Sequence, residues 1–221
     1  MDKKIIGFVP CKIESKRLSM KNLQFLHGKM LIETAIDYLL SSRYIDIVYV
    51  STEAAKADLL QDLLGHYGDS VKVVRRSGNL DNNPEAWMID LYYDFFKMEM
   101  PEFDIMVTTN ADAPLKPLNL DGIIERFVEY GSWEFFTTNP DTGLRSGALN
   151  IYTRNVIEKR LTSQLTMSLP LELIDIHTAT DLKDASDKLA FLYSKSIRQR
   201  DYENGMKRTA QDQEKYGSSA L

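Results

Sequence analysis

The chain has 221 residues, of which 43% are hydrophobic and 27% are charged, with a formal net charge of -5. This composition is typical of a globular protein, and the negative charge argues against a general nucleic-acid binder, because neutralising a phosphate backbone requires a basic surface. The single cysteine, Cys11, excludes an internal disulfide bond, and no apolar run approaches the ~20 residues that span a bilayer. Because no signal-peptide core follows Met1, we expect a cytoplasmic protein without a membrane or nucleic-acid partner.

Short β-type runs alternate with amphipathic helical stretches along the chain. The predicted strands are at residues 5–9, 45–52, 71–74, 105–107, 135–137, 148–151 and 173–176. The predicted helices are at residues 31–40, 54–64, 84–98 and 121–130, and a last one is capped by Thr180. This alternation predicts an α/β fold with a mainly parallel sheet flanked by helices. We expect one domain over residues 1–197 and a polar C-terminal helix or tail over residues 198–221.

The loop after the first strand is rich in cations and hydroxyl groups. Its polar donors are Lys12, Ser15, Lys16, Arg17, Ser19 and Lys21. Open α/β sheets bind ligands at the carboxyl ends of their strands, and ammonium groups fixed at such an edge suit a polyphosphate. The sequence therefore predicts a site for a small, strongly anionic ligand at this loop.

This first loop, residues 12–23 followed by Gly28 and Lys29, resembles the nucleotide loop of the sugar-acid cytidylyltransferases. These enzymes activate sialic acid and its relatives and, more loosely, 3-deoxy-octulosonate. The resemblance covers residues 5–190, and four more blocks follow in the family's order at residues 50–53 with 75–76, 110–116, 146–148 and 174–178. It implies a Rossmann-like, three-layer nucleotidyltransferase fold of the glycosyltransferase-A kind, with a mostly parallel central sheet.

The resemblance also implies how the nucleotide is held. The residues expected to contact the triphosphate of CTP are Lys12, Ser15, Lys16 and Lys21, although the family's usual arginine is a lysine at position 12. Asn22 and Arg76 are expected to read the cytosine. Their side chains suit this role, because cytosine offers an acceptor carbonyl and ring nitrogen, and an asparagine can also accept from its amino group.

Two aspartates are expected to hold a divalent cation near the reacting phosphate. Attack on the α-phosphorus moves negative charge, which calls for Mg²⁺ with oxygen ligands, or Mn²⁺ in its place. Asp112 and Asp175 match the family's aspartates, whereas the second aspartate of its Asp-x-Asp pair is His177 here. Because Mg²⁺ disfavours nitrogen ligands, His177 either leaves the metal shell, contacts phosphate or substrate, or indicates a different ion.

The acceptor is expected to be smaller than in the sialic-acid enzymes. In the sialic-acid enzymes a long segment closes over the sugar and forms the dimer interface. In this sequence only the short stretch 138–145 stands in its place. A short sugar acid or a phosphonate then becomes the expected acceptor, and the protein is a monomer or a homodimer. The residues expected to contact this anionic acceptor are Lys116, Arg145, Ser146 and His177.

These observations predict a cytidylyltransferase that transfers CMP from CTP to an acceptor oxygen and releases pyrophosphate. The residues expected to carry catalysis are Lys12, Lys16, Lys21, Asp112 and Asp175. One alternative is a glycosyltransferase that consumes a nucleotide sugar and uses Asn110-Ala111-Asp112 in place of an Asp-x-Asp motif. Another is a nucleotide-binding homologue that has lost its chemistry.

Overall fold

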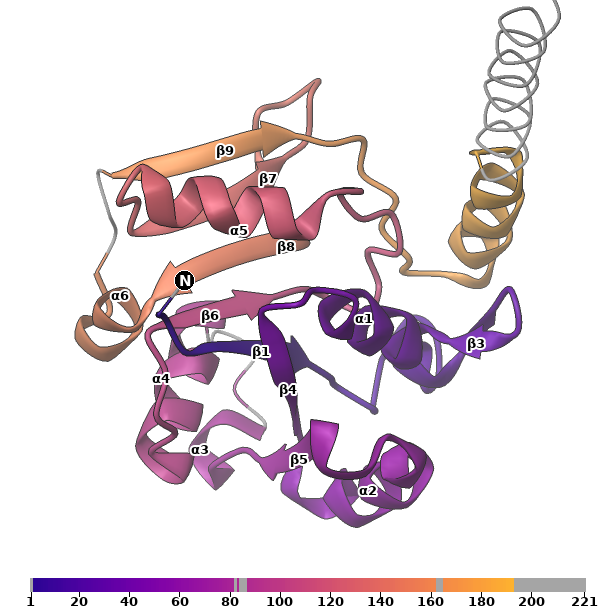
Figure 1. Ribbon diagram of the computed structural model, residues 1–221. Coiled ribbons are helices and arrows are strands. Elements are labelled where there is room, and N and C mark those ends of the chain that lie inside the picture. The colour runs from indigo at the N-terminus through magenta and orange to yellow at the C-terminus, as the bar shows by residue number, and fades with distance from the viewer. Residues whose placement is uncertain (1, 82, 84–86, 162–164, 193–221) are drawn as a thin grey trace, which may run out of the picture.

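A seven-stranded sheet forms the centre of the molecule in a computed structural model that describes residues 2–81, 83, 87–161 and 165–192. Figure 1 shows how its strands and the helices around them are arranged. The strand order is β5-β4-β1-β6-β8-β7-β9. The bounds are β1 (Ile5–Pro10), β4 (Ile45–Thr52), β5 (Val71–Arg75), β6 (Ile105–Thr108), β7 (Glu134–Thr138), β8 (Arg145–Thr153) and β9 (Thr166–Pro170). Only β8 runs against its neighbours β6 and β7 in this sheet, so the predicted mainly parallel arrangement is confirmed.

Helices cover both faces of the sheet and give three layers. The first face packs against α1 (Leu31–Leu40), α2 (Ala57–Leu64), α5 (Leu120–Glu129) and a helical segment at residues 179–192. The second face packs against α4 (Met88–Glu99) and α6 (Arg154–Lys159). Shorter turns are α3 (Gly78–Asp81), η1 (Lys21–Leu23), η2 (Ala54–Lys56) and η3 (Gly65–Ser70). None of the helices in the described part of the chain is long and apolar enough to cross a membrane.

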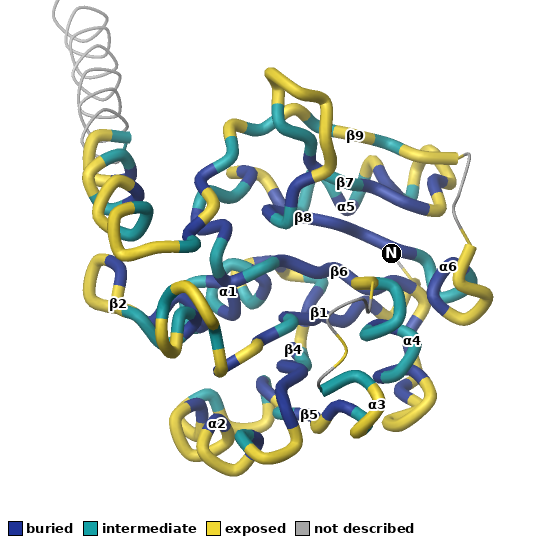
Figure 2. Tube along the Cα trace, turned by 180° about the vertical axis from the view of Figure 1, so that it is seen from behind, coloured by how far each residue is buried: buried dark blue, intermediate teal, exposed yellow. Residues whose placement is uncertain are grey.

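The central strand β1 is buried on both sides, as Figure 2 shows. Ile6 and Phe8 face α4, and Ile5 and Val9 face α1. This explains why the strand is a continuous apolar run rather than an alternating one. Gly7 leaves room for the neighbouring strand, because a Cβ atom there would lie 2.8 Å from Cγ2 of Val48.

Two local predictions differ from the structure. The predicted strand at residues 173–176 is wrong: its backbone is not part of the sheet, and the edge strand is β9 instead. The apolar alternation there arises because Ile174 and Ile176 are both buried, while the Ile176 amide donates to the Asp112 carbonyl oxygen rather than to a strand. A small hairpin of β2 (Phe25–Leu26) and β3 (Lys29–Met30) was not predicted.

Several helix ends also differ. The last helix is capped by Thr178 rather than Thr180, because the Thr178 amide donates to Asp181 Oδ2 at 2.7 Å and the Asp181 amide donates to Thr178 Oγ1 at 3.2 Å. Helix α4 begins at Met88, and the predicted start at residue 84 lies outside the described residues. The predicted tail, 198–221, also lies outside them. The short helix α6 was not predicted.

Candidate active site

A cavity of about 470 Å³ lies at the carboxyl ends of β1, β5 and β6, between the first loop and the start of α4. It contains every residue predicted to bind the nucleotide: Lys12, Ser15, Lys16, Lys21, Asn22 and Arg76. Asn110 and Asp112, which follow β6, complete the lining on the opposite side. The structure thus brings together side chains that are almost a hundred residues apart in the sequence.

The first loop is held by hydrogen bonds at both ends of the peptide unit between Lys12 and Ile13. The Lys12 carbonyl oxygen accepts from Asn22 Nδ2 at 2.9 Å, and the Ile13 amide donates to Glu53 Oε2 at 3.0 Å. The Ile13 side chain is buried in the core. Of the ion pairs found among the described residues, none involves Lys12, Lys16 or Arg17. Lys12, Lys16 and Arg17 therefore line the cavity without an ion-pair partner among the described residues.

The two residues expected to read the base are held by polar contacts inside the protein. Arg76 is 8% exposed, and its guanidinium donates to Ser51 Oγ at 3.2 Å and to the Ser51 carbonyl oxygen at 3.0 Å. Burial lowers the pKa of Arg76, and the nearby Glu53 carboxylate opposes this effect. Asn22 is 5% exposed and is fixed by its bond to the first loop. Both side chains are preorganised at the cavity wall.

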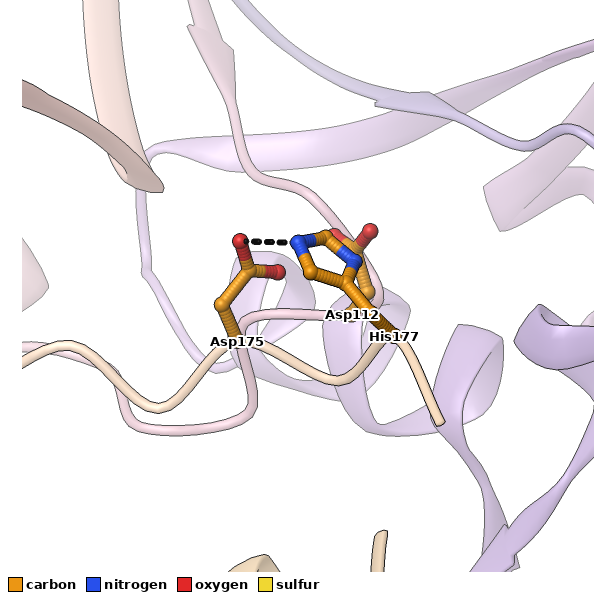
Figure 3. A group of neighbouring side chains, drawn as sticks. All are labelled: Asp112, Asp175 and His177. Atoms are coloured by element: carbon orange, nitrogen blue, oxygen red, sulfur yellow. Dashed lines mark ion pairs between the residues drawn. The ribbon is translucent and has the colours of Figure 1, made fainter. Parts of the chain in front are cut away.

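Two carboxylates and an imidazole meet beside this cavity (Figure 3). Asp112 follows β6, whereas Asp175 and His177 belong to the extended segment before residues 179–192, and one ligand atom from each lies within 4.8 Å of the others. The Ile176 amide donates to the Asp112 carbonyl oxygen at 2.9 Å and joins the two segments. His177 Nε2 lies 2.9 Å from Asp175 Oδ2, and Lys21 forms an ion pair with Asp112.

The charges of this cluster favour a cation. Burial raises the pKa of Asp175, and the neighbouring Asp112 carboxylate raises it further, while His177 and Lys21 lower it. Two carboxylates held this close repel each other, and positive charge between them relieves the repulsion. The donor set of two carboxylates and one imidazole therefore fits a divalent metal ion.

Three of the residues expected to contact the acceptor have partners within the protein. The Lys116 ammonium donates to Thr109 Oγ1 and to the Asn110 carbonyl oxygen, and burial lowers its pKa to about 7 against the effect of Asp112. The Arg145 guanidinium pairs with the buried Glu134 and lies over the Phe136 ring, 3.9 Å from its centre. The Ser146 hydroxyl is buried and lies 2.7 Å from Thr137 Oγ1.

Three residues at the site were not predicted from the sequence. Glu53 holds the first loop, Asn110 lines the cavity, and Glu134 neutralises Arg145. Gly147 allows Asn110 to lie where it does, because a Cβ atom there would be 2.2 Å from Asn110 Nδ2. For Glu53 and Asn110 the sequence signal was their place in the family blocks, whereas Glu134 lies in none of these blocks.

Known proteins resemble this chain in sequence and in fold. A family model described as "Cytidylyltransferase" matches residues 6–167. The chain is 29% identical over 161 residues to an uncharacterized protein of Methanocaldococcus jannaschii, which covers 71% of this chain and 59% of that protein. It is 29% identical over 115 residues to the CMP-N,N'-diacetyllegionaminic acid synthase of Legionella pneumophila, covering 51% of this chain and 48% of that enzyme. The chain thus spans about half to three fifths of the length of these curated relatives.

Solved structures share the three-layer architecture. A CMP:2-keto-3-deoxy-manno-octonic acid synthetase in complex with CTP superposes on this chain with a TM-score of 0.64 at 14% identity. The superposition covers 85% of this chain and 98% of the other. At this level of identity the likeness concerns the fold, and it agrees with the architecture predicted from the sequence.

Proposed function

This chain belongs to the cytidylyltransferase family, and from that premise we propose that it transfers CMP from CTP to an oxygen of a small anionic acceptor. The acceptor oxygen attacks the α-phosphorus, the bond from this phosphorus to the bridging oxygen breaks, and pyrophosphate leaves. One observation carries the proposal: the cations of the first loop line a cavity together with Asp112, and Asp175 lies beside Asp112 at its edge. No protein nucleophile is required for this reaction, so the protein contributes position and charge.

The cationic loop is proposed to hold the triphosphate. Lys12, Lys16 and Lys21 neutralise the phosphates and the leaving pyrophosphate, and the Ser15 hydroxyl donates to a phosphate oxygen. Asn22 and Arg76 select cytosine from the cavity wall. Their existing bonds to backbone atoms hold both side chains in place before the base arrives, which lowers the entropic cost of recognition.

Asp112 and Asp175 are proposed to hold Mg²⁺, with Mn²⁺ as the alternative. Such an ion stabilises the negative charge that develops on the α-phosphate. The repulsion between the two carboxylates supports this proposal, and so does the position of His177 beside them. An imidazole ligand suits Mn²⁺ better than Mg²⁺, so the preference between the two ions reports whether His177 joins the metal shell.

The acceptor is proposed to bind next to these carboxylates, at His177, Lys116, Arg145 and Ser146. Of these four residues, His177 lies closest to the aspartates, because it contacts Asp175 directly. Arg145 would contact the acceptor with the part of its guanidinium that does not pair with Glu134. Its side chain is 46% exposed, so a ligand can reach it. A short sugar acid or a phosphonate carries the negative charge that the Arg145 guanidinium, and Lys116 in its protonated form, would bind.

The test is a pyrophosphate-release assay with CTP, Mg²⁺ or Mn²⁺, and a panel of sugar acids and phosphonates, run beside ATP, GTP and UTP. We expect release with CTP and one acceptor class, and a loss of at least about 100-fold in Asp112→Asn. Glu102→Gln serves as the control, because Glu102 pairs with Lys4 on the exposed surface.

The assay also separates the alternatives. CTP binding without pyrophosphate release for any acceptor would overturn the proposal in favour of a nucleotide-binding homologue. Release of a nucleoside diphosphate from a nucleotide sugar would overturn it in favour of a glycosyltransferase.

A further inference from the structure

Glu53 is a buried carboxylate behind the cationic loop. It follows the last residue of β4 and is 8% exposed. It lines a second cavity of about 490 Å³ that shares the first loop but does not include Asp112, Asn22 or Arg76. The carboxylate therefore lies on the far side of the loop from the aspartate pair.

Both oxygens of this carboxylate accept hydrogen bonds from the loop. Oε2 accepts from the Ile13 amide at 3.0 Å, and Oε1 accepts from the Glu14 amide at 3.2 Å. The Thr52 hydroxyl also donates to Oε2, at 2.9 Å. Burial alone would raise the pKa of Glu53, but these hydrogen bonds outweigh it and lower the pKa below its ordinary value. The Glu53 carboxylate is thus a stable anion, and each of its oxygens already accepts at least one hydrogen bond.

Two successive amide donors require two acceptor oxygens at a fixed spacing. Only a carboxylate offers this pair, since a glutamine would turn an NH₂ group toward one of the amides. Asn22 holds the carbonyl of the same peptide unit whose amide Glu53 binds, so the Lys12–Ile13 peptide is fixed at both ends. This fixes the direction in which Lys12 leaves the backbone, and it holds the loop up to Glu14, directly before Ser15 and Lys16.

We infer that Glu53 is a positioning residue, which clamps the backbone of the first loop so that its side chains meet the β- and γ-phosphates. This inference rests on the proposed function. A carboxylate this close to the proposed polyphosphate site would repel the phosphates if its oxygens pointed toward them. Its place behind the loop, with both oxygens bound to backbone amides, gives the loop rigidity without that repulsion.

The test compares CTP and CMP binding to Glu53→Gln, measured by calorimetry on the full chain at a temperature where circular dichroism shows it folded. We expect CTP to bind at least about 10-fold more weakly and CMP less than about 3-fold more weakly, because CMP lacks the outer phosphates. Glu102→Gln makes the same change in charge on a distant surface and should leave both affinities as in the wild type. Amide hydrogen exchange at Ile13 should become faster in Glu53→Gln.

A second variant, Glu53→Asp, keeps the charge but is one methylene too short to reach both amides, and it should give the same selective loss. Should Glu53→Gln fail to fold, Glu53→Asp is judged by the same criteria. Equal losses for CTP and CMP, or wild-type affinity for both, would overturn the inference alone. Absence of CTP binding in the wild-type protein would overturn the proposed function as well.

Discussion

Lys116 gives the fold a pH-dependent stability that can be measured without knowing the substrate. Burial lowers the pKa of its ammonium from the ordinary 10.5 to about 7 in the folded protein. In the unfolded chain the same lysine keeps its proton to about pH 10. Between about pH 7 and pH 10 the unfolded state therefore binds more protons than the folded state, so the free energy of unfolding rises with pH.

The size of this effect follows from the shift in pKa. A full proton difference raises the free energy of unfolding by about 1.4 kcal/mol for each pH unit. Part of the Lys116 side chain still contacts solvent, so we expect about half of this slope, or roughly 1 to 1.5 kcal/mol between about pH 7 and pH 9. Below about pH 7 both states are protonated, and this source of pH dependence vanishes.

Urea unfolding of the wild type and Lys116→Met over this pH range tests the reasoning. The methionine keeps the length of the side chain and cannot titrate, so the difference between the two proteins in free energy of unfolding should change steadily in favour of the wild type as pH rises. Parallel curves for the two proteins would refute the reasoning. They would mean that the ammonium is solvated well enough to keep an ordinary pKa.

Three further variants test the site. Lys21→Ala removes the partner of Asp112 and a proposed phosphate contact, and it should lower turnover by about 100-fold and CTP affinity by a smaller factor of about 10; unchanged turnover in a steady-state assay would remove Lys21 from the mechanism. Arg76→Met should reduce the preference for CTP over UTP by about 10-fold in competition binding, whereas Arg75→Met, which loses only a surface contact, should keep it. Gly147→Ala places a methyl group against Asn110 and should lower activity by about 10-fold with little change in melting temperature, and wild-type activity would show that Asn110 moves freely.

The gathering of the proposed nucleotide-binding residues at one cavity was predictable from the sequence, because these residues follow buried strands. An apolar run such as residues 5–9 identifies a central strand, and polar residues after such strands meet at one edge of a parallel sheet. Lys12, Lys21 and Asp112 come together at one cavity as expected. Asp175 also lies beside Asp112, although the strand predicted for it is extended backbone outside the sheet.

The remaining features depend on contacts that sequence patterns do not contain. The β2–β3 hairpin turns through His27 and Gly28, both with positive φ, and a histidine at such a position gives little warning of a two-residue turn. Glu53 resembles any surface glutamate after a strand, because its role depends on where the first loop folds back. The sequence predicts that Arg145 contacts the acceptor, but nothing in it indicates that Glu134 on the neighbouring strand pairs with Arg145.

The backbone hydrogen bond from Ile176 to Asp112 has a consequence for how the protein matures during synthesis. The loop that would hold the nucleotide, and the strands that carry it, leave the ribosome early, whereas Asp175 emerges only after the whole sheet has been translated. On the proposed function, a nascent chain or a C-terminally shortened product that lacks Asp175 would carry the nucleotide loop but only one of the two carboxylates. The second carboxylate of the pair is thus the last to be synthesised, and the hydrogen bond from the Ile176 amide places it beside Asp112.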